Sequence, residues 1–370
     1  MVNENRLVQR FIQLVQIDSV SGEERELAEF LKSEFALRGL TAVEDQAGLV
    51  LGLQAGNLLV KIPGNKNKPG LLFAAHMDTV EPGRGVKAIK EDDVIRSSGD
   101  TILGSDDKAA IAILLEACDV LIGSNIDHPP IEMLFTIAEE QGLLGIKQFD
   151  FGRIEARMGY VLDAGGPPGT IVIQAPCQNE IEYIVQGKSA HAGMNPEDGI
   201  NAIQLAALAV SKMPCGRLDT STTCNLGLIE GGIARNIVPD WCSIKGEVRS
   251  YQRNRLDELT ILLKETFISE VEARGGKAQV DIKFLYPEIM LDRQSEVVQL
   301  AVKAAERIGI KPSLAGAGGG SDANIINHRG IPCANLGIGM KDVHTCNENI
   351  NITDLIKATE LVISIMETAS

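Results

Sequence analysis

Hydrophobic residues recur at helical spacing in residues 5–17 and 22–38, at the start of the chain. Ser21 is a favourable residue to cap the second of these helices, and Glu24 follows it at the spacing of a capping box. Residues 107–122 are almost continuously apolar, which predicts a helix that is buried on all sides.

Three apolar runs, at 70–79, 131–142 and 158–166, predict strands, and each run ends in polar or charged residues. Residues 49–53 and 57–64 predict a hairpin or two adjacent strands. Helices that alternate with such strands favour a largely parallel sheet flanked by helices. Ligands of sheets of this kind bind beyond the carboxyl ends of the strands.

The pattern changes at about residue 179, where apolar and polar residues alternate as in a half-exposed strand. The elements expected from there to residue 287 follow the order strand, helix, strand, strand, helix, strand, which is the ferredoxin-like arrangement. We therefore predict an α/β domain formed by residues 1–178 and 288–370, with a smaller α+β domain of residues 179–287 inserted into it. Further helices are expected at 199–212, 253–273, 294–308 and 352–368.

The composition is that of a globular protein: of 370 residues, 44% are hydrophobic and only 4% aromatic. A formal net charge of −15 argues against a nucleic-acid partner, because phosphate binding needs a basic surface. No apolar stretch reaches the roughly 20 residues that cross a bilayer. The first residues lack the basic start and apolar centre of a signal peptide. Seven cysteines without a CxxC pair favour free, buried thiols in a reducing cytoplasm.

Acidic residues stand at the ends of the three apolar runs. His76 and Asp78 lie two residues apart, so in a strand they face the same way and Asp78 can orient the imidazole. Glu139 and Glu140 end the second run and Asp163 ends the third. Taken singly, each residue has an ordinary explanation, since strand ends meet solvent and aspartate caps helices.

Taken together, these residues favour a metal site. Three strands would deliver their carboxylates to one edge of a sheet, where His76 and His344 can join them. Crowded carboxylates repel one another and are stable only with cations between them. Histidine nitrogens with carboxylate oxygens suit two Zn²⁺ ions. A structural role of the acidic cluster without metal is the competing interpretation.

Eight segments carry a resemblance to a known family: AAHMDTV, GSDDKAA, TIAEEQGLLG, LDAGG, GKSAHAG, GGIARNIVPD, GGGSDANI and KDVHTCNENI. In order and spacing they resemble the dinuclear zinc exopeptidases and amidohydrolases, which include peptidase T, carboxypeptidase G and aminoacylase. The resemblance extends over residues 1–370, and the segments AAHMDTVEPG and GSDDKAAIA are most similar to the peptidase T-like, tripeptide aminopeptidase branch. It implies a zinc-exopeptidase catalytic domain with an inserted lid and dimerisation domain.

The resemblance also implies two metal ions per chain, Zn²⁺ or in its place Co²⁺ or Mn²⁺, held by His76, Asp106, Glu140, Asp163 and His344. Asp106 would bridge the two ions, with Asp163 on the ion of His76 and Glu140 on the ion of His344. Glu139 would be the general base that takes a proton from the attacking water, and Asp78 would orient His76.

Two further residues near these positions receive ordinary interpretations. Asp107 is expected to be a charge at the start of a helix, and Cys346 a buried thiol that binds no metal.

In the inserted domain, the resemblance implies that His191 stabilises the tetrahedral oxyanion, often in the partner subunit's site of a dimer. Asn236 and Arg249 match positions that bind substrate carboxylate or amide groups, although Arg249 is equally well explained as a surface charge at a strand end. Ser321 and Asp322, in a glycine-rich loop, are expected to line the substrate cleft. Arg235 stands where many relatives carry a small or hydroxylated residue, which leaves the substrate preference open.

These features predict a cytoplasmic, metal-dependent exopeptidase that acts on short peptides, as an aminopeptidase on tripeptides, and forms a homodimer through the lid domain. Neither a nucleic acid nor a membrane is an expected partner. One alternative is an amidohydrolase of N-acyl amino acids, or a dipeptidase, with the same chemistry. A second is a non-catalytic relative that binds metal or peptide. The presence of both Asp78 and Glu139 argues against the second alternative, because binding alone needs no general base.

Overall fold

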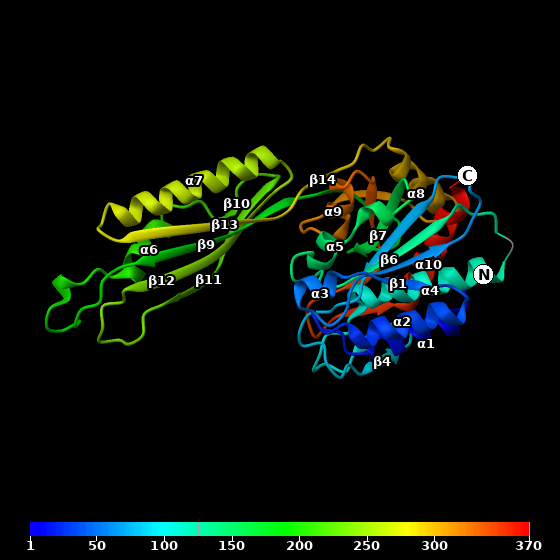
Figure 1. Cartoon of the computed structure of the whole chain (residues 1–370), viewed down its shortest axis with the longest axis horizontal. Helices are drawn as coiled ribbons and strands as arrows, with labels where there is room; N and C mark the ends of the chain where they lie inside the picture. Colours follow the sequence, from blue (N-terminus) through cyan, green and yellow to red (C-terminus); the bar gives the residue numbers. More distant parts are fainter. Residues whose placement is uncertain (125, 370) are drawn as a thin grey trace. The chain divides into compact units, whose positions relative to one another are not determined.

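The computed structural model describes residues 1–124 and 126–369. The chain divides into two compact units, one formed by residues 1–174 and 290–370 and the other by residues 175–289 (Figure 1). The second unit begins four residues before the predicted position 179 and ends two residues after the predicted position 287.

A central sheet forms the middle of the first unit, in the strand order β1-β2-β6-β3-β7-β16-β8. The four strands β6, β3, β7 and β16 run parallel, whereas β1, β2 and β8 join this group through antiparallel pairs. The predicted largely parallel sheet is therefore confirmed. The strands are β1 (Ala42–Glu44), β2 (Leu58–Ile62), β3 (Leu71–His76), β6 (Ile131–Thr136), β7 (Met158–Ala164), β8 (Thr170–Ala175), β15 (Ser313–Gly316), which pairs with β8, and β16 (Cys333–Gly337). The two-residue strand β14 (Ile289–Met290) lies at the boundary of the units.

A smaller antiparallel sheet of the first unit has the order β17-β18-β5-β4. Its strands are β4 (Ala88–Glu91), β5 (Val94–Ser97), β17 (Met340–Lys341) and β18 (Asn349–Asn351). The helices of the unit are α1 (Glu4–Val15), α2 (Arg25–Leu37), α3 (Ala47–Leu51), α4 (Ser105–Gly123), α5 (Leu144–Gln148), α8 (Glu296–Arg307), α9 (Asp322–His328) and α10 (Ile352–Thr368), with a short 3₁₀ helix at Phe151–Arg153.

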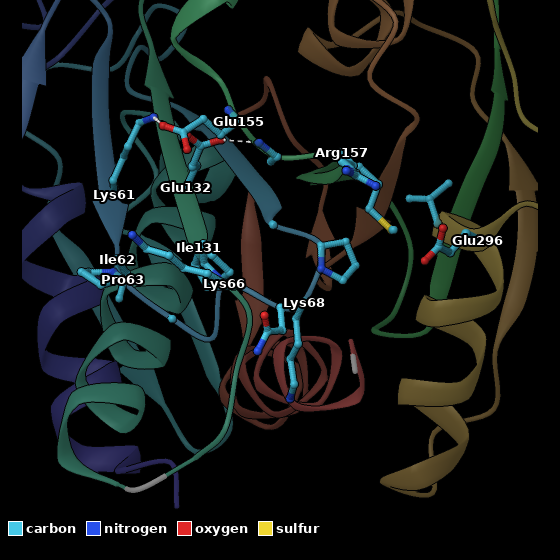
Figure 2. Close-up of a pocket in the computed structure, with 18 of the residues that line it drawn as sticks. Lys61, Ile62, Pro63, Lys66, Lys68, Ile131, Glu132, Glu155, Arg157 and Glu296 are labelled. Atoms are coloured by element: carbon cyan, nitrogen blue, oxygen red, sulfur yellow. Dashed lines mark hydrogen bonds and ion pairs between the residues drawn. The ribbon is translucent and has the colours of Figure 1, made fainter.

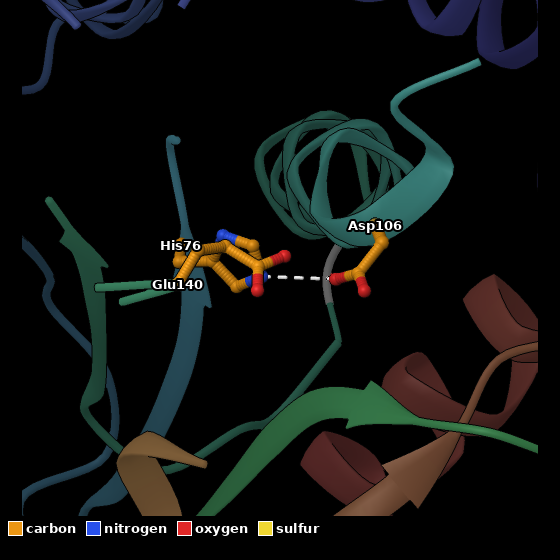
Figure 3. A group of neighbouring side chains, drawn as sticks. All are labelled: His76, Asp106 and Glu140. Carbon is orange, nitrogen blue, oxygen red and sulfur yellow. Dashed lines mark hydrogen bonds and ion pairs between the residues drawn. The ribbon is translucent and has the colours of Figure 1, made fainter. Parts of the chain in front are cut away.

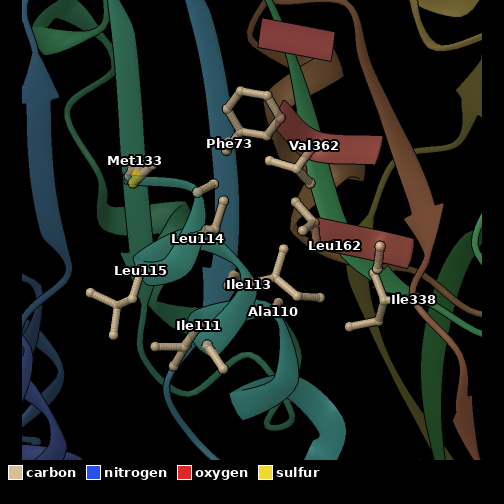
Figure 4. Close-up of a cluster of buried hydrophobic side chains, with 14 of the residues drawn as sticks. Phe73, Ala110, Ile111, Ile113, Leu114, Leu115, Met133, Leu162, Ile338 and Val362 are labelled. Carbon is tan, nitrogen blue, oxygen red and sulfur yellow. The ribbon is translucent and has the colours of Figure 1, made fainter. Parts of the chain in front are cut away.

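The core of the first unit is centred on α4, which packs on β3 and β7 and is covered by α1 and α10. Figure 4 shows Ile113 and Leu114 of this helix among side chains from the sheet and α10, including Phe73 and Val362. Nearly all residues of this helix are buried, the charged Lys108 and Glu116 among them, so the prediction of a buried helix is confirmed.

The second unit contains an antiparallel sheet in the order β10-β11-β12-β9-β13. Its elements are β9 (Cys177–Gln186), a 3₁₀ helix at Pro196–Asp198, α6 (Ala202–Val210), β10 (Gly216–Arg217), β11 (Thr222–Gly231), β12 (Trp241–Ser250), α7 (Arg253–Glu272) and β13 (Lys277–Tyr286). Apart from the two-residue β10 and the short 3₁₀ helix, this is the predicted order. A separate core forms between the sheet and the two α-helices, where the rings of Tyr183 and Phe267 lie 4.8 Å apart.

Three local predictions were wrong. Residues 49–53 contribute to helix α3 and not to a strand, and Leu49 and Val50 are 82% and 68% exposed, so this apolar run is not a core segment. Helix α2 begins at Arg25, and neither Ser21 nor Glu24 forms the predicted capping box. Of the seven cysteines, all of which are described and free, two are exposed, and Cys346 is one of them.

A pocket of about 810 Å³ opens in the first unit at the amino ends of β3, β6 and β7 (Figure 2). Its wall includes Lys61, whose Nζ lies 2.9 Å from Glu132 Oε1 and 2.7 Å from Glu155 Oε1. The pocket is thus at the sheet edge opposite to the carboxyl ends of these strands. No helix in the described part of the chain is long and apolar enough to cross a membrane.

Candidate metal centre

Three parallel strands bring the predicted acidic residues to one edge of the central sheet. His76 is the last residue of β3, and its register partner on β6 is Thr136. Glu139 and Glu140 follow Thr136 in the chain, and Asp163 lies near the carboxyl end of β7. This edge is where ligands of parallel sheets bind.

Asp106 lies between the two histidines. Its Oδ1 is 2.9 Å from His76 Nε2, and its Oδ2 is 3.2 Å from His344 Nε2. The same nitrogen of His344 lies 2.8 Å from Glu140 Oε1. Figure 3 shows the side chains of His76, Glu140 and Asp106 turned toward one another. Each oxygen of Asp106 therefore faces a different imidazole, which is the placement that a bridging carboxylate needs.

A second group of carboxylates adjoins the first. Oxygens of Asp106, Asp107 and Asp163 lie within 4.8 Å of one another. Asp107 is fully buried, and its Oδ2 accepts the backbone N–H of His76 at 3.2 Å. Its Oδ1 has no hydrogen-bond partner among the described residues. Asp107 lies at the start of α4, as expected, but the chain is not helical at Asp106 and Asp107 and turns this side chain inward.

The electrostatics of the cluster favour cations. Burial, followed by repulsion from Asp163, raises the pKa of Glu139 well above its usual range. Burial and then the charge of Asp106 raise the pKa of Asp163 in the same way. Hydrogen bonds to Asp106 and Glu140 raise the pKa of His344 to about 10. The cluster on its own must therefore hold protons, and divalent cations are the natural replacement for them. Imidazole nitrogens and carboxylate oxygens fit Zn²⁺ and similar ions.

The main contact between Asp78 and His76 differs from the predicted one, which joined the carboxylate to the imidazole. His76 Nδ1 lies 2.9 Å from the main-chain oxygen of Asp78 and 3.5 Å from its Oδ1. The carboxylate itself accepts the backbone N–H groups of Glu139 and Glu140, at 2.9 Å and 3.2 Å, and the hydroxyl of Ser21 at 2.6 Å. Asp78 therefore orients His76 mainly through its backbone and holds the two glutamates with its side chain.

Glu348 is a residue of this site that the sequence did not indicate. It is 1% exposed, and its carboxylate accepts the N–H groups of Leu103, Gly104 and Asp106 at 2.8, 2.7 and 3.0 Å. It also accepts the hydroxyl of Ser105 at 2.6 Å. Four hydrogen bonds to one loop fix the backbone that presents Asp106 between the histidines.

Ser321 and Asp322 are 5% and 2% exposed, so neither side chain lines an open cleft in this structure. Ser321 caps helix α9 and accepts a hydrogen bond from Asn335, and Asp322 accepts one from Thr136. Their predicted contact with substrate stays a prediction.

The remaining predicted residues lie in the second unit. His191 is exposed, and its Nδ1 accepts the N–H groups of Gly193 and Met194, at 3.2 Å and 3.1 Å. The backbone N–H of Ala192 donates to the main-chain oxygen of Asn236 at 3.0 Å, so His191 and Asn236 belong to one pair of loops.

Arg249 is not close to these loops. It forms a two-pronged ion pair with Glu247, with nitrogen–oxygen distances of 2.9 Å and 3.0 Å. Arg249 pairs with Gln178 near one end of β12, whereas Trp241, which pairs with Gln186, begins the strand at the loop end. Trp241 and Arg249 are eight positions apart along the strand, which corresponds to about 26 Å.

Comparison with known proteins identifies the family. Residues 72–368 match peptidase family M20/M25/M40. The chain belongs to this family. PepT, an aminopeptidase from Bacillus cereus ATCC 10987, is 44% identical with a TM-score of 0.92, over 100% of this chain and 99% of its own. A tripeptidase from Staphylococcus aureus subsp. aureus Mu50 is 38% identical with a TM-score of 0.96, over the same shares. Peptidase T of Shouchella clausii (strain KSM-K16) is 26% identical over 98% of both chains.

These similarities confirm the resemblance to the peptidase T-like branch of the M20/M25/M40 peptidases. They cover the full chain, so the second unit is part of what is shared. The roles of the individual residues, and the number and identity of the metal ions, do not follow from similarity and are proposals.

Proposed function

We propose that this M20/M25/M40 peptidase is a metal-dependent aminopeptidase that removes residues from short peptides, and from tripeptides in particular. The observation that carries the proposal is Asp106, whose two oxygens face His76 and His344. The substrate class is supported by the similarity to an aminopeptidase PepT and to a tripeptidase over nearly the full length of each chain.

The proposed ligands are His76 and Asp163 for one ion, His344 and Glu140 for the other, and Asp106 for both. When bound there, two divalent ions, which we propose to be Zn²⁺, would lower the pKa of a water molecule and polarise the substrate carbonyl. The donor set equally accepts Co²⁺ or Mn²⁺.

Glu139 is the proposed general base. It takes one proton from the water as the oxygen–carbon bond forms, and it delivers that proton to the amine nitrogen as the carbon–nitrogen bond breaks. Glu139 is 8% exposed, so little bulk water competes for the proton that its carboxyl group carries.

His191 is the proposed donor to the oxyanion. Its Nδ1 accepts two backbone hydrogen bonds, so the proton of the neutral ring resides on Nε2, which is then available to donate. Asn236 is proposed to assist it from the neighbouring loop. Arg249 is a weaker substrate-binding proposal, because Glu247 already pairs with its guanidinium group. A homodimer through the second unit and a cytoplasmic location complete the proposal.

The test combines metal content with activity. The protein is purified without added metal, bound ions are counted, and di-, tri- and tetrapeptides and N-acetyl amino acids are assayed before and after chelation and zinc return. We expect about two ions per chain and a tripeptidase activity that chelation abolishes and zinc restores. Turnover of N-acetyl amino acids alone would replace the proposal by the amidohydrolase alternative.

A pair of matched variants tests the general base. Glu139→Gln should lower kcat by about 100-fold to 10,000-fold while metal binding persists. Glu155→Gln is the control, because Glu155 is exposed at the opposite edge of the sheet. Parent-like turnover by Glu139→Gln would exclude Glu139 as the base, and metal binding without any turnover in the parent would favour a non-catalytic relative.

A further inference from the structure

The segment that carries Glu139 and Glu140 is held in an unusual way. After β6 ends at Thr136, four consecutive backbone N–H groups, those of residues 137–140, donate to side-chain oxygens. The acceptors are Asn57 at 3.2 Å, Glu24 at 3.0 Å and the two oxygens of Asp78 at 2.9 Å and 3.2 Å. Three side chains therefore replace the neighbouring strand that would usually satisfy such groups.

These acceptors are themselves fixed. Glu24, Asn57 and Asp78 are each 0% exposed. The Oε1 atom of Glu24 also accepts the N–H of Gly22 at 2.8 Å. Asn57 donates to Asp45 at 2.7 Å and to the main-chain oxygen of Gly145 at 2.9 Å. A buried side chain that further hydrogen bonds hold in this way has little freedom to move, so it fixes the position of the segment that donates to it.

The backbone at Ala138 needs such support. Its φ angle is +47°, in the left-handed region that residues with a Cβ atom seldom occupy. The N–H of this residue donates to Glu24 and its C=O accepts the N–H of Leu144 at 3.0 Å, and the next residue in the chain is Glu139. Loss of the bond to Glu24 frees the peptide unit before Ala138, so the left-handed conformation of this residue, and with it the direction in which the chain enters Glu139, is no longer held from that side.

We propose that Glu24 is a positioning residue for peptide hydrolysis, which fixes the Ala138 backbone and thereby sets the Glu139 carboxylate. The inference rests on the proposed role of Glu139 as general base. Glu24 acts through its length and its acceptor oxygen. Its charge is not required, and because burial raises the pKa of Glu24 to about 7, a neutral side chain of the same shape is a suitable replacement.

The competing explanation is that Glu24 only stabilises the fold, and the chain offers a matched control for it. Glu132 is 3% exposed, and its Oε2 accepts two backbone N–H groups, those of Glu155 and Ala156, at 2.9 Å and 2.8 Å. Glu132 belongs to β6, the strand that leads into residues 137–140, but it lies in the pocket at the opposite edge of the sheet. Equivalent changes at Glu24 and Glu132 disturb similar networks, and only one of these networks reaches Glu139.

The experiment compares Glu24→Gln and Glu24→Asp with Glu132→Gln and Glu132→Asp in the full chain loaded with zinc. Glutamine keeps the length and the acceptor, whereas aspartate keeps the charge and withdraws the acceptor by one methylene. Glu24→Asp should lower kcat by about tenfold to 100-fold, the effect of misplacing a catalytic group by about 1 Å. Its KM and its number of bound ions should stay within about twofold of the parent, and Glu24→Gln should keep kcat within about threefold.

Hydrogen–deuterium exchange supplies a readout that does not depend on activity. The backbone amides of residues 137–140 should exchange faster in Glu24→Asp than in the parent, and at the parent's rate in Glu132→Asp. If Glu24→Asp does not fold, Glu24→Met takes its place, since methionine preserves the length and offers no oxygen acceptor.

Several outcomes would overturn the inference. These are full activity and parent-like exchange in Glu24→Asp, an equal loss of kcat in Glu24→Gln and Glu24→Asp, or an equal loss in Glu132→Asp. A parent enzyme that cleaves no peptide would overturn the proposed function instead, and the exchange rates would still decide whether Glu24 holds the segment.

Discussion

Replacing Glu348 by alanine should destabilise the first unit even without any metal. The substitution leaves four buried donors without their acceptor, namely three backbone N–H groups and the hydroxyl of Ser105. An unsatisfied buried polar group costs about 1–3 kcal/mol. Water can enter the space that the side chain vacates, so we take the lower end and expect a loss of about 4 kcal/mol. Glu348→Gln keeps one carbonyl acceptor and should lose about half as much.

The measurement is urea unfolding in the presence of a chelator, followed by far-UV circular dichroism and by tryptophan fluorescence. With a slope of about 3 kcal/mol/M, a loss of 4 kcal/mol moves the midpoint by about 1.3 M. The only tryptophan of the sequence, Trp241, lies in the second unit and reports on it separately. The fluorescence transition should therefore stay in place while the transition of the first unit moves.

Glu360→Ala is the control, because Glu360 is exposed on the same helix, α10, that follows the Glu348 segment. Its effect should stay within about 0.5 kcal/mol. A circular dichroism transition of Glu348→Ala that coincides with that of the parent would refute the argument that these four hydrogen bonds hold the loop of Asp106.

Three further predictions follow from the same structure. Burial alone would raise the pKa of Glu44, but hydrogen bonds from Arg25 and Lys32 lower it to about 2, so its contribution to stability is present above pH 4.5 and is lost as the pH falls toward 2. Glu44→Gln should therefore lower the free energy of unfolding by about 1–2 kcal/mol at pH 7, after allowance for solvent screening, and by much less at pH 2, in urea titrations at both pH values. A gap at pH 2 as large as the gap at pH 7 would contradict it. Zinc at about 1,000 times its dissociation constant should stabilise the first unit by about 4 kcal/mol in thermal unfolding, and chelation should remove this gain. Leu114→Ala, at a fully buried position of α4, should cost about 2–5 kcal/mol, whereas Leu37→Ala, at a position 82% exposed, should change stability by less than about 0.5 kcal/mol in the same assay.

The fold could be predicted from the sequence where the hydrophobic period is long. Helices α7 and α10 begin at the predicted residues, and α4 differs from its prediction by two residues at its start. The short apolar run at 49–53 led to a wrong prediction of a strand. Five apolar residues fit a strand and a helical turn equally well, and only their burial distinguishes the two. Gly52, in the left-handed region at φ +72°, ends that short helix.

The candidate site was predictable where its residues end strands, and not where they support others. His76, Glu139, Glu140 and Asp163 each follow an apolar run, which is a local signal. The role of Glu348 has no local signal in the sequence, because the loop that it holds is more than 240 residues away in the chain. Glu24 gave a misleading signal: its spacing from Ser21 suits a capping box, but the two side chains instead reach Ala138 and Asp78. Such contacts depend on tertiary structure alone.

The second unit starts and finishes on neighbouring strands, and this has a consequence for its modularity. Gln178 on β9 and Tyr286 on β13 are register partners, and just outside the unit the N–H of Leu291 donates to the main-chain oxygen of Ile173 at 2.8 Å, so the chain enters and leaves the unit at neighbouring points. A unit with adjoining ends can be gained or lost by a single genetic insertion or deletion without rethreading the host domain. Joining residue 174 to residue 290 by a short flexible linker would give a minimal protein that retains every proposed metal ligand and Glu139 but lacks His191, Asn236 and Arg249.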